Sequence, residues 1–144
     1  MHAAFTSLGF LHWKIFEETV DHSDVAEFIN ELAPLLTANS VGLFENALNQ
    51  RTNDIRNAIN NAFAGKYFYC AAYSPHLKPI EHAFFLVRNY IQTCDQDLDY
   101  INNPEELINK VFARFKVGSE HASVLYNEFF LYRNNHAMYL DQLN

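Results

Sequence analysis

Apolar positions alternate or cluster in four short stretches that predict β-strands. The first two, residues 4–8 and 11–16, are rich in β-branched and aromatic residues and lie on either side of Gly9-Phe10, which favours a β-hairpin with its turn at that pair. Residues 41–44 form a short apolar run that ends in polar residues, as a buried parallel strand does at its carboxyl end. A fourth run, residues 66–71, predicts another strand.

Five further stretches carry apolar residues at helical spacing. They cover residues 24–36, 53–63 and 80–92, and two more begin at Pro104 and after Ser119. Ser23 and Thr52 are predicted to cap the first two helices, and Pro79 is suited to the first position of the third. The predicted order is β-β-α-β-α-β-α-α-α. This order indicates one α/β domain over residues 1–144, with a mixed sheet flanked by helices.

Composition is that of one globular domain with an acidic surface. The chain has 144 residues, of which 49% are hydrophobic, and a formal net charge of -7. Such a charge repels phosphate backbones and anionic membranes, so it disfavours DNA as a partner. No stretch is long and apolar enough to predict a membrane span. Cys70 and Cys94 form no disulfide or zinc pattern, which favours a reducing, intracellular location.

Two acidic residues occupy positions where α/β sheets place chemistry. Glu45 follows the predicted strand at 41–44, and Glu81 falls in the first turn of the predicted helix at 80–92. The carboxyl ends of parallel strands and the starts of the following helices gather ligand-binding groups. Thirty-five residues lie between the two. Glu45 and Glu81 are therefore the candidate site residues.

The segments around these two residues resemble a known family. Residues 40–47 read SVGLFENA and residues 73–82 read YSPHLKPIEH. They are similar to the second and third blocks of the catalytic domain of DDE transposases of the mariner-like and bacterial insertion-sequence type. Those blocks read Asp-Asn-Ala and Tyr-Ser-Pro-x-x-Asn-Pro-Ile-Glu. The likeness extends from about Ala4 to about Tyr132 and implies a truncated RNase H-like domain.

The resemblance implies metal-dependent DNA cleavage and strand transfer. In such enzymes three carboxylates hold two Mg²⁺ or Mn²⁺ ions. Glu81 matches the final Glu of the family and Glu45 stands at its second Asp, so both are the implied catalytic residues and metal ligands. The first catalytic Asp belongs to a strand before the hairpin. Because the chain begins at Met1 within the hairpin, that strand and its Asp are expected to be missing.

Two departures from the family pattern predict a degenerate site. Glu45 carries one methylene more than the Asp it replaces, which displaces the carboxylate in a site that tolerates only about 0.5 Å. Lys78 replaces the Asn that would cap the next helix, and lysine has no acceptor for its N–H groups. We therefore expect a fragment that is inactive on its own and holds its metal ions unproductively.

Alternative interpretations stay open. One alternative is a domesticated, non-enzymatic protein-interaction module. Another is that the chain is part of an active transposase whose upstream region lies outside it. The alternative for Glu81 is an ordinary first-turn carboxylate that the helix dipole favours. The alternative for Glu45 is a solvated residue at a strand end. His76 and His82 are typical surface histidines, and the acidic residues 95–99 a solvated connection rather than a calcium loop.

Partners and compartment follow from the same reasoning. The resemblance implies DNA binding, which the net charge disfavours, and the pattern assigns no DNA-contacting residue. Loss of a first strand would leave an exposed sheet edge, through which copies of the chain could associate. A nuclear location is expected in a eukaryote and a cytoplasmic one in a bacterium.

Overall fold

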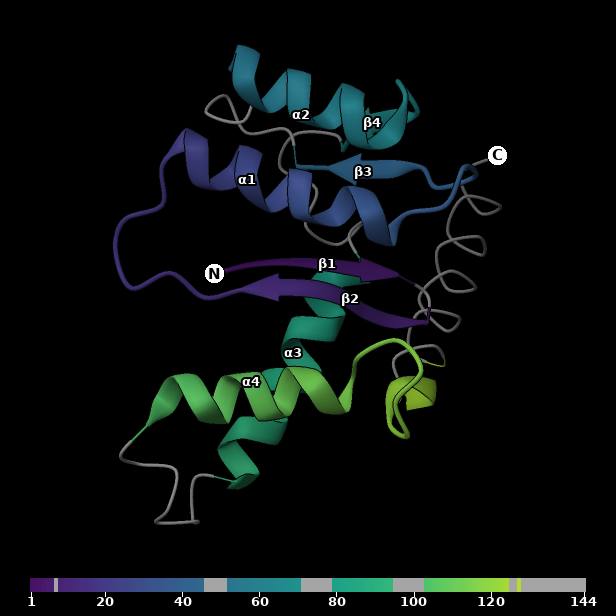
Figure 1. The fold of residues 1–144 in the computed structure, drawn as a ribbon. Helices are drawn as coiled ribbons and strands as arrows, with labels where there is room; N and C mark the ends of the chain where they lie inside the picture. The colour runs from purple at the N-terminus through teal and green to yellow at the C-terminus, as the bar shows by residue number, and fades with distance from the viewer. Residues whose placement is uncertain (7, 46–51, 71–78, 95–102, 125–126, 128–144) are drawn as a thin grey trace, which may run out of the picture. The chain divides into compact units, whose positions relative to one another are not determined.

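The computed structural model describes residues 1–6, 8–45, 52–70, 79–94, 103–124 and 127 (Figure 1). In chain order the elements are β1 (His2–Thr6), β2 (Gly9–Lys14), α1 (His22–Leu32), the 3-10 helix η1 (Ala33–Leu35), β3 (Gly42–Phe44), α2 (Asn53–Phe63), β4 (Tyr67–Tyr69), α3 (Pro79–Cys94) and α4 (Pro104–Arg114). The predicted α/β class is confirmed. Residues 122–124 are helical, where the last helix was expected, and most of that helix lies outside the described residues.

The chain divides into two compact units. The first unit comprises residues 1–2 and 14–77, and the second comprises residues 3–13 and 78–144. Each unit has its own cluster of buried apolar side chains. Each is described below by itself.

The described strands form two pairs. β1 pairs with β2, and the two run in opposite directions in Figure 1. β3 pairs with β4 in parallel, with Leu43 opposite Phe68 and Phe44 opposite Tyr69. The parallel direction predicted for the strand at 41–44 is confirmed. Within the described residues the two pairs are separate sheets of two strands each.

The hairpin turn lies earlier than the sequence predicted. Gly9 and Phe10 belong to β2, and the strands are connected between Thr6 and Gly9. The hydroxyl of Thr6 donates to the carbonyl of Gly9 at 3.1 Å and accepts from the N–H of Leu8 at 3.1 Å. These two hydrogen bonds of the Thr6 hydroxyl stabilise the short connection between β1 and β2. The prediction of the turn at Gly9-Phe10 was therefore wrong. Phe10 lies within β2, where its side chain is buried in the core.

The core of the first unit lies between α1, α2 and one face of the β3–β4 pair. Its buried members are Ile29, Ile55, Ala58, Ile59 and Phe63. The strands add the partly buried side chains of Phe44, Tyr67 and Tyr69. These rings contact one another edge to face, and those of Phe44 and Phe63 lie 5.4 Å apart.

The opposite face of β3–β4 corrects one prediction. Leu43 is 60% exposed and its register partner Phe68 is 67% exposed. The strand at 41–44 was expected to be buried, and this was wrong for Leu43. Side chains alternate along a strand, so Phe44 packs on the helices while Leu43 points the other way.

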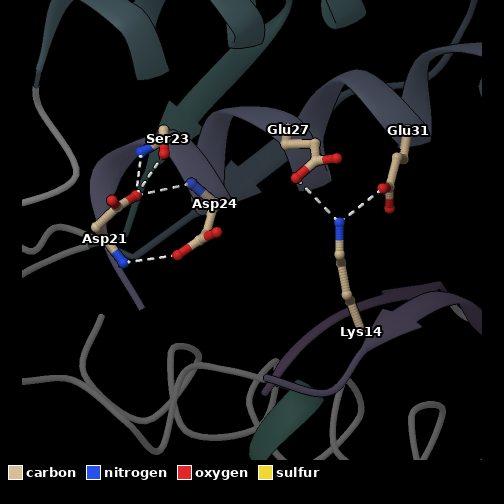
Figure 2. Close-up of polar contacts among 6 residues, drawn as sticks. All are labelled: Lys14, Asp21, Ser23, Asp24, Glu27 and Glu31. Atoms are coloured by element: carbon tan, nitrogen blue, oxygen red, sulfur yellow. Dashed lines mark hydrogen bonds and ion pairs between the residues drawn. The ribbon is translucent and has the colours of Figure 1, made fainter. Parts of the chain in front are cut away.

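Helix α1 begins two residues before the predicted start. Asp21 is its N-cap, and one carboxylate oxygen accepts from the N–H groups of Ser23 and Asp24 at 2.7 and 3.0 Å (Figure 2). The carboxylate of Asp24 accepts in return from the N–H of Asp21 at 2.9 Å. This reciprocal pair is a capping box. Ser23 was predicted as the cap, but it lies inside the helix and its hydroxyl donates to the carboxylate of Asp21 at 2.6 Å.

Helices α2, α3 and α4 start where the sequence predicted. Thr52 is the N-cap of α2, although its side chain makes no capping hydrogen bond. Pro79 is the first residue of α3, and Asn103 caps α4 by accepting from the N–H of Glu106 at 3.2 Å. At the far end of α2, Ala64 adopts a left-handed conformation with φ of 50°, which ends that helix.

Phe10 is the centre of the second unit. It is fully buried, and its ring lies 4.6 Å from that of Phe112 on α4 and 5.3 Å from that of Phe5 on β1. Helix α3 adds the buried Ala83 and Val87 to the same cluster. The hairpin therefore packs on the two helices through one face of β2.

Gly9 is required by the segment that follows α4. The N–H of Phe10 donates to the carbonyl of Phe115 at 2.9 Å, and the N–H of Val117 donates to the carbonyl of Phe10 at 3.0 Å. This pairing brings backbone against Gly9, where an added Cβ would lie 2.5 Å from the carbonyl oxygen of Phe115. Gly9 also has a φ of +127°, which L-residues rarely adopt.

Replacing Gly9 is expected to destabilise the protein more than replacing another glycine with positive φ. Gly118 has a φ of +83° with open space around its Cβ position, so Gly118→Ala adds backbone strain alone. We expect Gly118→Ala to lower the free energy of unfolding by about 1 kcal/mol. Gly9→Ala should lower it by about 3 kcal/mol, because a clash with fixed backbone is added. Urea denaturation measures both, and equal losses would contradict the close approach.

The cap of α1 is expected to stabilise the protein in a pH-dependent way. The Ser23 hydroxyl, followed by the N–H groups of Asp24 and Ser23, lowers the pKa of Asp21 below 3.8. Stabilisation by this group is therefore present above the ordinary pKa and is lost as pH falls through the lower value of the folded state. Asp21→Ala should lower the melting temperature at about pH 7 and have little effect at about pH 2.

Thermal melts followed by circular dichroism test this expectation. Glu18→Ala is the control, because Glu18 is an exposed carboxylate outside any helix. A loss from Asp21→Ala that is equally large at both pH values would show that the carboxylate charge is not what stabilises the helix.

Candidate functional site

Glu45 lies where the sequence predicted, directly after β3. The strand is held in register by hydrogen bonds from the N–H of Gly42 to the carbonyl of Lys66 at 2.9 Å and from the N–H of Cys70 to the carbonyl of Phe44 at 2.7 Å. Because β3 and β4 are parallel, Glu45 stands at the carboxyl end of the pair. Its side chain is exposed. The placement of Glu45 at a strand end is confirmed.

Glu81 lies in the first turn of α3, as predicted. The helix turns Ala83 and Val87 into the core of the second unit, which leaves Glu81, Phe85 and Arg88 on the exposed side. A carboxylate in the first turn interacts favourably with the positive end of the helix dipole. Its position therefore has a structural benefit whether or not it has a chemical role.

The two carboxylates belong to different units: Glu45 to the first and Glu81 to the second. The structure defines the local surroundings of each within its own unit. Among the described residues, no three His, Cys, Asp or Glu side chains are grouped so that they could hold a metal ion.

A two-metal centre needs more donors than these positions supply. Two bridged divalent ions require three carboxylates in a set geometry, and Glu45 and Glu81 provide two. Both are exposed at the surface of their units. The described residues therefore do not fit a two-metal centre, and Mg²⁺ or Mn²⁺ binding stays a prediction from the resemblance.

Other residues singled out in the sequence have varied outcomes. His82 is exposed on α3, next to Glu81. Cys70 is a free, half-buried thiol after β4, and Cys94 is the last residue of α3. His76, Lys78 and the acidic residues 95–99 lie outside the described residues.

An ion-pair cluster that the sequence analysis missed joins β2 to α1. The ammonium group of Lys14 lies 3.1 Å from the carboxylate of Glu27 and 2.8 Å from that of Glu31 (Figure 2). Hydrogen bonds to Glu31 and then to Glu27 raise the pKa of Lys14. The signal was the spacing of two Glu four residues apart on one helix, which puts both on the same face.

The basic residues near the end of α4 also have partners. Lys110 pairs with Glu106 at 3.0 Å, one helical turn earlier. The guanidinium carbon of Arg114 lies 5.1 Å from the centroid of the Tyr90 ring, a cation–π contact. Lys110 and Arg114, two cations that could have formed a DNA-binding patch on α4, therefore already contact neighbouring side chains.

Comparison with known protein families, curated proteins and solved structures finds no match for this chain. None of the described helices is long and apolar enough to cross a membrane.

The exposure of the two carboxylates predicts that neither holds the fold together. Glu45→Gln and Glu81→Gln should each change the free energy of unfolding by less than about 0.5 kcal/mol, because interactions of exposed side chains contribute little to stability. As a control, Val87→Ala removes buried atoms and should cost about 2 kcal/mol. Urea denaturation would contradict this if either Glu variant lost as much as the core variant.

Proposed function

We propose that this chain derives from the catalytic domain of a DDE transposase and is, by itself, a degenerate fragment that neither cleaves nor joins DNA. The single observation that carries the proposal is the pair of segments around Glu45 and Glu81, which are similar to two blocks of that family. The fold that goes with it is a truncated RNase H-like domain. The order of elements from β1 to α4 is compatible with this architecture.

Local placement supports the assignment of the two carboxylates. A DDE domain takes its second ligand from the end of a central parallel strand and its third from the start of a later helix. Glu45 directly follows β3, which is parallel to β4, and Glu81 is in the first turn of α3. These features are shared by many α/β proteins, so the segments themselves are what single out the transposase.

The donor set supports the inactive form of the proposal. With two carboxylates, one of them a Glu in place of Asp, the two bridged metal ions of the family lack a ligand. Productive phosphoryl transfer depends on donors placed within about 0.5 Å. Glu45 and Glu81 are therefore too few donors to position the ions that the chemistry requires.

Charge supports weak DNA binding. The net charge is -7, and Lys110 and Arg114 already contact Glu106 and Tyr90. A surface with few clustered cations and an overall negative charge releases few counterions on binding DNA. We expect a dissociation constant no tighter than the non-specific range of about 10⁻⁴ to 10⁻⁶ M.

A second candidate function is a domesticated protein-interaction module. It is favoured by the outer face of the β3–β4 pair, where Leu43 and Phe68 are register partners and both more than half exposed. Exposed apolar side chains next to each other are typical of association surfaces. Sedimentation analysis separates the two functions, since a dimer that Phe68→Ser dissociates would favour the module.

The main test is a plasmid-nicking assay on the purified chain with Mg²⁺ or Mn²⁺. We expect no nicking above background, and the same result for Glu81→Ala. Glu45→Asp should also remain inactive, because it restores the family residue at one position and leaves the site one ligand short.

Nicking by the chain that requires the metal ion and disappears in Glu81→Ala would overturn the inactive form of the proposal. It would favour the remaining alternative, in which the chain is part of an active transposase. A mobility-shift assay with duplex DNA provides the second measurement, and a nanomolar complex would contradict the expected weak binding.

A further inference from the structure

We propose that His2 is a pH-sensitive contact that holds the start of β1 against α1 only while its imidazole is neutral. This inference is independent of the transposase proposal. It concerns contacts of His2 within the first unit and involves neither Glu45 nor Glu81.

Two aromatic rings surround the His2 side chain. The ring centroid of Phe16, which follows β2, lies 5.3 Å from that of His2, and the two ring planes meet at 73°. The ring centroid of Phe28 on α1 lies 5.6 Å from that of His2. Phe28 is itself buried. The imidazole therefore packs against Phe16 and Phe28 in the way an apolar ring would.

The buried nitrogen of this ring has no polar partner. Nε2 of His2 is shielded from solvent and makes no hydrogen bond in the described structure. A neutral imidazole can leave one nitrogen without a partner at a modest cost. A protonated ring carries an N–H at both nitrogens and a full charge, which is far more costly to remove from water.

The charged groups around the site have opposing effects. Burial, and then the amino group of Met1, lower the pKa of His2, whereas Asp24 on α1 raises it. Lys14 on β2 also lies against the Phe16 ring, 5.7 Å from its centroid. Its charge is balanced by the two carboxylates of α1 that it binds. The lowering effects prevail, so the contact disfavours the proton.

The direction of the pH effect follows from this. A histidine released from the contact titrates near its ordinary pKa of 6.5, and the docked histidine titrates lower. The contact is therefore at full strength above 6.5 and weakens as pH falls through 6.5 toward the lower value. Acid favours the state in which the start of β1 has left α1.

An NMR titration of the full chain tests the first half of the proposal. The Hε1 resonance of His2 should shift with a midpoint below 6.5. A midpoint at or above 6.5 would overturn the proposal without any variant having to fold.

Hydrogen exchange tests the second half. Amide protection of β1, corrected for intrinsic exchange rates, should be lost on going from about pH 7.5 to about pH 5.5 in the unmodified chain. His2→Phe keeps a ring in the space and cannot titrate, so it should keep its protection at both pH values. His2→Gln provides a second variant that cannot titrate.

The control is His22→Gln, because His22 is an exposed histidine at the first position of α1 in the same unit. This variant should lose protection of β1 in acid as the unmodified chain does. Equal loss of protection in His2→Phe and His2→Gln, or retention of protection in His22→Gln, would show that His2 is not the group that responds to pH.

Discussion

The second unit depends on the pairing of Phe10 with the backbone that follows α4. Two hydrogen bonds, one to the carbonyl of Phe115 and one from the N–H of Val117, join residues that are far apart in the sequence. They bury the Phe10 ring completely against α3 and α4. Gly9 is a condition of this pairing, since a side chain there would occupy the space of the Phe115 carbonyl. The hairpin is thus held by tertiary contacts, because a two-stranded hairpin alone is marginally stable.

The first unit is organised by a different constraint, the parallel pairing of two strands of three residues each. Parallel strands require a connection that crosses over, and α2 supplies it. The helix packs Ile55 and Ile59 against the inner face of the pair, together with Ile29 of α1. This arrangement places Glu45 at the carboxyl end of the strands. It also leaves Leu43 and Phe68 on the outer face, which is the basis of the interaction-module alternative.

The transposase proposal concerns two residues of the described structure, Glu45 and Glu81. Glu45 lies at a strand end and Glu81 in a first helical turn, and each belongs to a separate unit. The charged cluster of Lys14 with two carboxylates of α1 has no counterpart in that proposal. It joins Lys14, the last residue of β2, to α1 within the first unit.

Local chemistry alone was enough to predict most of the elements. The starts of α3 at Pro79 and of α4 after Asn103 follow from residues whose effect acts within one helical turn. The start of α1 was misplaced at Ser23, because Asp21, two residues earlier, is the cap and accepts from the N–H groups of Ser23 and Asp24. Periodicity likewise predicted a helix over residues 80–92, since apolar residues recur there at helical spacing.

Tertiary structure decided what depends on distant partners. The sequence predicted that Gly9 lies in a turn. The structure places it within β2, where the close approach of the Phe115 backbone leaves no room for a side chain. An apolar run is compatible with burial on one face or on both, so the exposure of Leu43 depended on what packs against β3. The sequence by itself determined the candidate carboxylates and their local positions. The contacts of His2 were decided by folding, because its ring neighbours Phe16 and Phe28 are distant from it in the sequence.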